Sequence, residues 1–253
     1  MSRKTVLIRI FRIVILILIY LGVWQLLSMI VGSSLLLPSP VETAERFFRI
    51  IVDKDCLLDL GFTFLRLIAG YLLGAAAGIV LAVLTARSSF YRFLLSPFRV
   101  LIKSTPVLSF VLLLLVSVVS NMVPVVVAAI MVAPMIWATT EQAILSLDTK
   151  LTEMACLYFT PFQRFHLVYL PQMLPQILAS GLTALGFAWK AVITAEVLSL
   201  PKFAIGNRMY LSKIYLETPD MVAWTVLVVS LSLALELLLK YTTKRLRRRY
   251  DSD

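Results

Sequence analysis

The chain has 253 residues, of which 60% are hydrophobic and only 15% are charged. This composition is too apolar for a soluble domain of that length, so it excludes a soluble protein and indicates an integral membrane protein. The formal charge of +10 could suggest a nucleic-acid partner, but the basic residues lie in clusters at 3–12, 87–103 and 240–249 that flank apolar runs. Such flanking clusters are typical of the cytoplasmic side of membrane proteins, and we expect no nucleic acid to bind.

The first apolar run, about residues 10–31, is long enough for the roughly 20 residues of helix that cross a bilayer, and we interpret it as a retained membrane span. The segment after it has an acidic bias between positions 42 and 59, which places it outside the cell. Pro38 and Pro40 break the chain there. Residues 41–52 are then expected to form an amphipathic helix at the membrane interface.

The second span, about residues 61–86, contains Gly70, Gly74 and Gly78 at every fourth position. Small residues on one face of a helix let another helix approach closely, so we predict that these glycines form a packing face. Arg66 lies near the outer end of the same span. It is expected to extend toward water or to pair with an acid such as Asp59.

The segment from residue 87 to residue 106 contains four basic residues and no acidic one, so we predict a cytoplasmic loop. A third span is expected over about residues 105–119 and a fourth over about 123–140, with a tight outer turn between them. Pro134 lies within the fourth span and predicts a kink there.

The longest polar interruption of the second half, residues 150–171, contains the only histidine of the chain. Its polar and apolar residues alternate at helical spacing up to a break at Thr160-Pro161, and a second short helix is expected to end at Leu170-Pro171. Two short amphipathic helices between membrane spans need a partner surface. We therefore predict that residues 150–171 form a cytoplasmic docking loop, and this name is kept below.

A fifth span is expected from about residue 172 to 199 and a sixth from about 221 to 239. Six spans place both termini in the cytoplasm, in agreement with the loop charges. The predicted fold is an all-α integral membrane protein with six transmembrane helices, and residues 1–253 are expected to form a single transmembrane domain. The basic tail from Lys240 is expected to contact anionic lipid of the inner leaflet.

The residue pattern contains no Gly-rich phosphate loop and no Cys or His cluster for a metal, so we expect neither an enzyme nor a bound cofactor. Lys190 and Glu196 lie within the fifth span, where ionisable groups are costly and often functional. Both could line the outer half of a translocation path or its gate. Alternatively, Lys190 extends outward to water and Glu196 lies at the water boundary. Glu236 and Lys240, four residues apart, are expected to pair.

The docking loop resembles the EAA loop of permease subunits in ATP-binding-cassette (ABC) importers of type I, because Glu153-Met154-Ala155 is followed by a turn and by Leu170-Pro171 before a long span. Further segments resemble the nitrate/sulfonate/taurine branch of these permeases and extend the resemblance over most of the chain: LLPSPVE, TFLR ending at Arg66, KSTPV, AWK, AEV and YLETPDMVAWT. The resemblance implies that the loop forms coupling helices for an ATPase subunit, through Glu153, Met154, Ala155, Phe159, Thr160, Pro161, Arg164, Leu170 and Pro171. Thr160-Pro161 is expected to supply the break for which the family usually uses a glycine.

By this resemblance the chain is a permease that forms a homodimer in the membrane of a prokaryotic cell, receives solute from an extracytoplasmic binding protein and relies on a separate chain to bind ATP. The substrate would be a nitrate, sulfonate or taurine-like anion or a vitamin precursor, and the lysine in span five mildly favours an anion. The alternative is a self-contained secondary carrier or channel. That class predicts an internal repeat with paired broken helices, which the sequence lacks.

Overall fold

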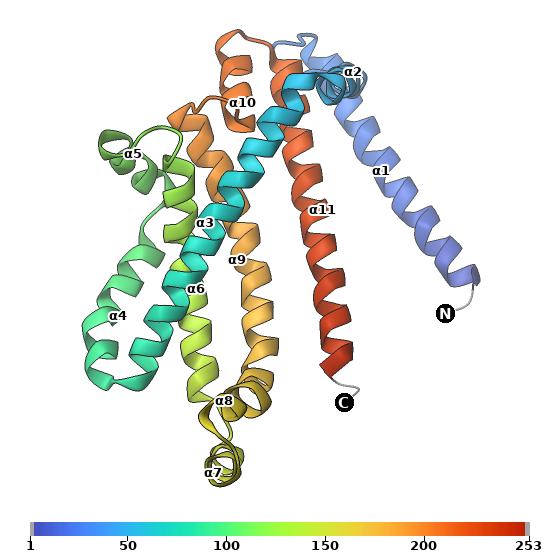
Figure 1. Ribbon diagram of the computed structural model, residues 1–253. Coiled ribbons are helices and arrows are strands. Elements are labelled where there is room, and N and C mark those ends of the chain that lie inside the picture. The colour runs from blue at the N-terminus through green and yellow to red at the C-terminus, as the bar shows by residue number, and fades with distance from the viewer. Residues whose placement is uncertain (1–2, 251–253) are drawn as a thin grey trace. The chain divides into compact units, whose positions relative to one another are not determined.

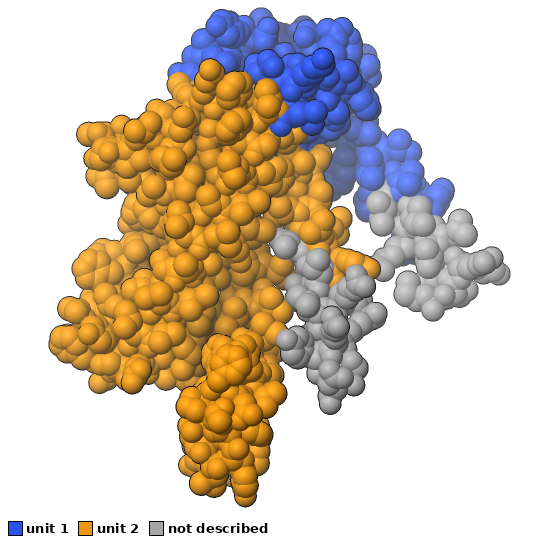
Figure 2. Space-filling view, in the orientation of Figure 1, with its two compact units in different colours: residues 1–57, 208–229 blue, residues 58–207, 230–253 orange. Residues whose placement is uncertain are grey.

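The computed structural model describes the backbone of residues 3–250 and, within that range, every side chain except those of 3–10, 13, 239 and 242–250. The predicted contact of the basic tail with lipid therefore falls mostly outside the described side chains. The described part is helical and contains no strand. It divides into two compact units, residues 1–57 with 208–229 and residues 58–207 with 230–253 (Figure 2).

The first unit contains α1 (Arg3–Val31), α2 (Pro40–Val52) and parts of three further helices, α3 (Lys54–Arg87), α10 (Ile205–Ile214) and α11 (Thr218–Tyr250). α2 begins with a capping box, in which the Ser39 side chain accepts from the Glu42 N–H and the Glu42 carboxylate accepts from the Ser39 N–H. These two bonds satisfy backbone donors that a helix start leaves without partners. The helix expected over residues 41–52 is confirmed.

The second unit is built around α6 (Val123–Leu145), which packs along α9 (Leu170–Ser199). Most of the positions that face inward on α6 carry valine, alanine or isoleucine. A cluster of five buried side chains joins α6 and α9 to α5 (Val107–Ser117): Val111, Val123, Val127, Ala191 and Ala195.

The glycine stripe of α3 lies directly against α6. A Cβ atom added at Gly70 would lie 2.6 Å from the Cβ of Ala128, and one added at Gly78 would lie 2.6 Å from the carbonyl oxygen of Ala133. These distances are shorter than real Cβ contacts, so only glycine allows the backbones of the two helices to come this close. Dispersion between closely packed backbones is the main attraction available to helices in lipid.

The segment expected as a cytoplasmic loop at 87–106 is mostly helical, and the third span expected over 105–119 corresponds to the second helix of a bent pair. The structure has two helices there, α4 (Ser89–Ser104) and α5, which are bent by 101° at a break that contains Pro106 (Figure 1). Proline has no N–H to continue a helix and disfavours helical geometry in the residue before it. α5 is only about 16 Å long at 1.5 Å per residue, too short for a bilayer core of about 30 Å.

The charges of α4 explain why the sequence indicated a loop. Arg92 donates to the buried Glu141 of α6 at 3.1 Å, and Arg99 also pairs with this carboxylate and lies over the ring of Trp137 at 5.1 Å. Two of the basic residues therefore hold α4 against α6. A count of loop charges does not reveal such a pairing, because Glu141 lies more than 40 positions further along the chain.

Five helices are long and apolar enough to cross a membrane, and the crossings number six if the bent pair α4–α5 counts as one. The candidate spans are Val14–Val31, Lys54–Arg87, Val123–Leu145, Pro161–Ser199 and Thr218–Leu238. The expected first, second, fourth, fifth and sixth spans are confirmed. The short helix α10 was not expected.

Replacement of Gly74 by alanine should destabilise the pair α3–α6, because the added methyl would lie 2.6 Å from the carbonyl oxygen of Ala129 and 2.8 Å from the Cβ of Val132. Overpacking of this kind costs about 1–3 kcal/mol. We expect a lower thermal unfolding midpoint for the purified protein in detergent. Gly61→Ala is the matched control on the same helix, because a Cβ there meets nothing within 4 Å. Equal midpoints for the two variants would contradict the packing role.

Candidate functional site

The docking loop folds as two short helices separated by a capped turn. α7 (Thr149–Tyr158) begins at Asp148, whose side chain accepts from the N–H groups of Lys150 and Leu151 at 2.8 and 3.4 Å. α8 (Pro161–Arg164) begins at Thr160, which forms a capping box with Gln163. Pro161 occupies the first helical position, where its missing N–H has no cost. The break expected at Thr160-Pro161 is confirmed.

The second helix does not end at Leu170-Pro171 as expected. It continues through a π-helical stretch, η1 (Phe165–Tyr169), into α9, so that residues Pro161–Ser199 form one helical path of 39 residues. The N–H of Leu170 donates to the carbonyl of Phe165, five residues earlier. Pro171 has no N–H, and its ring would clash with the carbonyl four residues earlier in a regular α-helix. A wider π turn before the proline relieves this clash.

Two of the loop residues singled out by resemblance hold the loop together. Arg164 donates from Nε to the carbonyl of Phe159 at 3.0 Å and from Nη1 to the Sγ of Cys156 at 3.2 Å. Ala155 is fully buried, at the point where α7 packs against α8 and η1. Ala155 therefore offers no surface to a partner in this structure, whereas Glu153 and Met154 are exposed.

The loop also exposes large apolar side chains that sequence reasoning missed. Leu157, Tyr158 and Phe162 are 81%, 77% and 74% exposed. Figures 1 and 2 show α7 and α8 projecting beyond the ends of α6 and α9 as a separate lobe of the second unit. The available sequence signal was the presence of these apolar residues on both sides of the Thr160-Pro161 turn, in a segment otherwise classed as polar.

Glu196 is fully buried at the far end of α9. Its carboxylate accepts from Thr63 Oγ1 at 3.0 Å, from Arg66 Nη1 at 2.9 Å and from the N–H of Gly206 at 3.2 Å. In this structure Glu196 therefore lies neither at a water boundary nor on an open path. Sequence reasoning missed this because the counter-charge comes from α3, 130 positions earlier in the chain.

Arg66 extends the cluster from α9 to the loop that follows it. Its guanidinium also donates to the carbonyls of Lys202 and Phe203 at 3.0 and 2.9 Å. The acid with which Arg66 pairs is thus Glu196. Gly206 completes the cluster, because a Cβ there would lie 2.5 Å from the Cβ of Glu196. The cluster fixes the end of α9 to α3 and to the start of α10.

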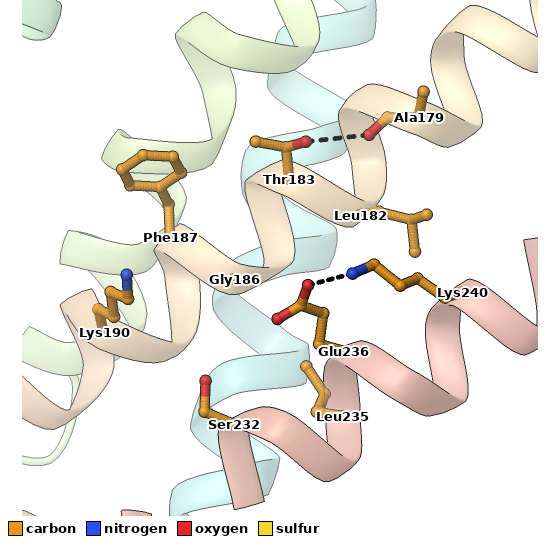
Figure 3. Close-up of a pocket in the computed structure, with 10 residues that line it drawn as sticks. All are labelled: Ala179, Leu182, Thr183, Gly186, Phe187, Lys190, Ser232, Leu235, Glu236 and Lys240. Atoms are coloured by element: carbon orange, nitrogen blue, oxygen red, sulfur yellow. Dashed lines mark hydrogen bonds and ion pairs between the residues drawn. The ribbon is translucent and has the colours of Figure 1, made fainter. Parts of the chain in front are cut away.

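Lys190 lies in a different environment, on a cavity of about 420 Å³ between α9 and the second half of α11 (Figure 3). Its Nζ lies 6.0 Å from the centre of the Phe187 ring. Glu236 and Lys240 line the same cavity and form the expected i, i+4 ion pair at 2.6 Å. The sequence placed Lys190 in the outer half of the bilayer and Glu236 near the inner end, but the structure brings both residues to one cavity.

The fold and the loop together define a class of protein: a multi-pass, all-helical membrane protein that presents a structured loop between α6 and α9. The family described as "Binding-protein-dependent transport system inner membrane component" matches residues 74–248, and the chain belongs to this family. It is a permease subunit of an ABC transporter, which excludes the alternative of a self-contained carrier or channel.

The sequence relatives are permeases of the same kind. A probable ABC transporter permease protein of Brucella melitensis biotype 1 is 26% identical over 230 residues, 89% of this chain and 92% of the relative. A putative aliphatic sulfonates transport permease protein of Bacillus subtilis (strain 168) is 28% identical over 71% of this chain and 66% of its own length. The nitrate import permease protein of Synechocystis sp. is 25% identical over 71% of this chain and 69% of its own length.

Solved structures share the fold. The methionine ABC transporter MetNI in an inward-facing conformation matches with a TM-score of 0.57 at 21% identity, over 77% of this chain and 93% of the matched chain. An amino acid ABC transporter crystallised with histidines matches with a TM-score of 0.58 at 18% identity, over 81% and 96% of the two chains. The fold is therefore that of type I ABC importer permeases.

Glu196→Gln should destabilise the protein strongly, because it leaves the buried Arg66 guanidinium without a counter-charge. Breaking a buried ion pair by removing one partner costs about 3–5 kcal/mol. We expect a large fall in the thermal midpoint in detergent. Glu45→Gln is the control, since Glu45 and Arg49 form an exposed i, i+4 pair worth no more than about 0.5 kcal/mol.

A double-mutant cycle separates the ion pair from general damage to the fold. Arg66→Met combined with Glu196→Gln should destabilise less than the sum of the single changes, because neither charge is then left alone. Additive effects of the two changes would contradict a coupled pair.

Proposed function

We propose that the chain is the translocating permease of an ATP-driven importer and that the docking loop seats in an ATPase subunit, which binds and hydrolyses the ATP. The observation that carries this proposal is the pre-folded loop with its exposed apolar side chains Leu157, Tyr158 and Phe162. A contiguous apolar surface that projects from a membrane protein into water is typical of a protein-binding site. The hydrogen bonds of Asp148, Thr160 and Arg164 keep the loop ordered before binding, which lowers the entropic cost of docking.

The continuous helix from Pro161 to Ser199 suggests how movement of the loop reaches the membrane. When the ATPase subunits close, α7 and α8 are displaced together, because Arg164 and Ala155 hold them to each other. The displacement passes through η1 into α9 without an intervening flexible link. α9 packs along α6, so its movement changes the lining of a path between two permease copies.

The family and the loop charges support the following assembly as part of the proposal. Two copies of the chain form a central path, and an extracytoplasmic binding protein delivers the solute. The basic clusters favour a cytoplasmic position for the docking loop and both termini in a prokaryotic cell, with the remaining apolar surface in contact with lipid. Both compact units act as one permease domain.

The substrate we propose is a small anion such as a sulfonate, taurine or nitrate, with a vitamin precursor as the further candidate. Two of the relatives are named as permeases for aliphatic sulfonates and for nitrate. Lys190, the ionisable residue that lines the cavity without an ion-pair partner among the described side chains, suits a negative charge.

Tyr158→Ala together with Phe162→Ala should weaken binding of the ATPase subunit, because each truncation removes an exposed aromatic anchor. Aromatic anchors at interfaces are commonly worth about 2 kcal/mol or more, which is about 30-fold in affinity for each truncation, so we expect recovery of the ATPase with the tagged permease to fall by at least about tenfold. Tyr215→Ala is the matched control, since Tyr215 is 70% exposed and lies outside the docking loop. A wild-type chain that recovers no ATPase subunit, or a loop variant with unchanged recovery and transport, would overturn the proposal.

The binding protein offers the sharpest test of substrate class. We expect thermal-shift screening of the binding protein that stimulates ATP hydrolysis by the reconstituted complex to identify an anionic ligand. The same ligand should be transported into proteoliposomes that contain the complex. A cationic or sugar ligand in both measurements would refute the anion proposal and leave the importer function intact.

A further inference from the structure

The cavity between α9 and α11 has the size of a small-molecule site. At about 420 Å³ it falls within the range of roughly 300–1,000 Å³ that ligand pockets occupy. It is lined by Ala179, Leu182, Thr183, Gly186, Phe187, Lys190, Ser232, Leu235, Glu236 and Lys240 (Figure 3). Gly186 keeps the α9 side of the cavity open, because a side chain there would start in space with no atom within 4 Å.

The charges around the cavity leave one cation uncompensated. Glu236 and Lys240 neutralise each other through an ion pair at 2.6 Å, and Figure 3 shows both side chains reaching from α11 toward α9. Lys190 has, among the described side chains, a cation–π contact with Phe187 at 6.0 Å and no direct ion pair, and the Glu236 carboxylate attracts it from a greater distance. An ammonium group within a membrane span is costly unless an opposite charge or water meets it. A monovalent anion would supply that charge.

The other lining residues indicate the shape of such an anion. Leu182, Leu235 and Phe187 provide apolar contact, whereas the hydroxyl of Ser232 faces the same space and can donate a hydrogen bond. Thr183 already donates its hydroxyl hydrogen to the carbonyl of Ala179 at 3.2 Å. The lining thus offers one free cation, one free hydroxyl donor and an apolar wall, counted over the side chains that the structure describes.

We propose that this cavity is a binding site for an oxyanion that carries a short apolar body, held by Lys190 and Ser232 against Phe187 and Leu235. This inference rests on the proposed importer function, because in an importer the bound oxyanion would be the solute that is being transported. The head group of an anionic lipid shares the same chemistry, an oxyanion beside an apolar chain, and the experiment separates the two sources.

The test uses the full-length chain, without the ATPase, in nanodiscs of phosphatidylcholine. 1-Propanesulfonate is the probe, and propylammonium is the control ligand of the same body and opposite charge, each measured by saturation-transfer NMR. We expect saturable binding of the sulfonate alone. Lys190→Met should weaken it about tenfold, the usual effect of removing one charge-assisted hydrogen bond, while Lys190→Arg retains it. Lys103→Met, an exposed lysine of α4 outside the cavity, should leave binding unchanged.

A second arm adds phosphatidylglycerol to the nanodiscs. If lipid is the natural occupant, wild-type protein retains phosphatidylglycerol in native mass spectrometry, Lys190→Met does not, and the lipid displaces propanesulfonate. If soluble solute is the occupant, propanesulfonate binds equally in both lipids. Equal binding of sulfonate and ammonium, no effect of Lys190→Met, or no saturable ligand in either arm would overturn the proposal.

These binding measurements are independent of the docking loop. Failed recovery of an ATPase subunit would refute the importer function and leave the anion site standing. Conversely, an intact complex that transports solute, with no Lys190-dependent binding in the nanodiscs, would refute the site alone. Folding of each variant is checked by its gel-filtration profile, and an exposed residue such as Lys190 should tolerate the change.

Discussion

The buried ion pair of Arg66 and Glu196 is the interaction on which the arrangement of α3 and α9 depends. Neither charge is stable in a dry environment without the other, and further donors of the guanidinium bind the carbonyls of Lys202 and Phe203. One carboxylate thereby joins a helix of the first half of the chain to the end of α9 and to the turn that follows. The glycine stripe continues this attachment along α3 by bringing it into backbone contact with α6.

The two ends of α9 are therefore fixed in different ways. Glu196 anchors its far end, while η1 joins its near end to the docking loop without a break. In the proposed mechanism, a displacement of the docking loop would act on a helix whose far end is fixed, and the contacts of α9 with α6 would change along its length. The cavity that contains Lys190 lies between these two ends, on the side of α9 that faces the second half of α11. Movement of α9 would change the distance between Lys190 and the lining residues of α11.

The sequence predicted the features that depend on local composition. Apolar runs located five of the spans, Pro38 and Pro40 marked the start of the helix over 41–52, and the i, i+4 spacing of Glu236 and Lys240 predicted their ion pair. It failed where the deciding partner is distant in the chain. The α4 segment was expected to be a loop because the partner of its arginines, Glu141, lies on α6. The burial of Glu196 against Arg66 was not predicted because the two residues are far apart in the sequence. The π turn before Pro171 was likewise not predicted, because the sequence suggested that the second loop helix ends at Leu170-Pro171, whereas it continues into α9.

Lys190 and Glu196 show how position on a helix, and not residue type, decides the role of an intramembrane charge. They are six residues apart, which separates them by about a third of a turn around α9. Glu196 faces α3, where Thr63 and Arg66 donate hydrogen bonds to its carboxylate, so Glu196 has a structural role. Lys190 faces the cavity beside α11, where Glu236 is already paired with Lys240, so Lys190 has no direct ion pair among the described side chains. A lysine without a direct ion pair beside a cavity, on the same helix as an acid that is fully paired, is the arrangement from which we infer a site for a negative charge.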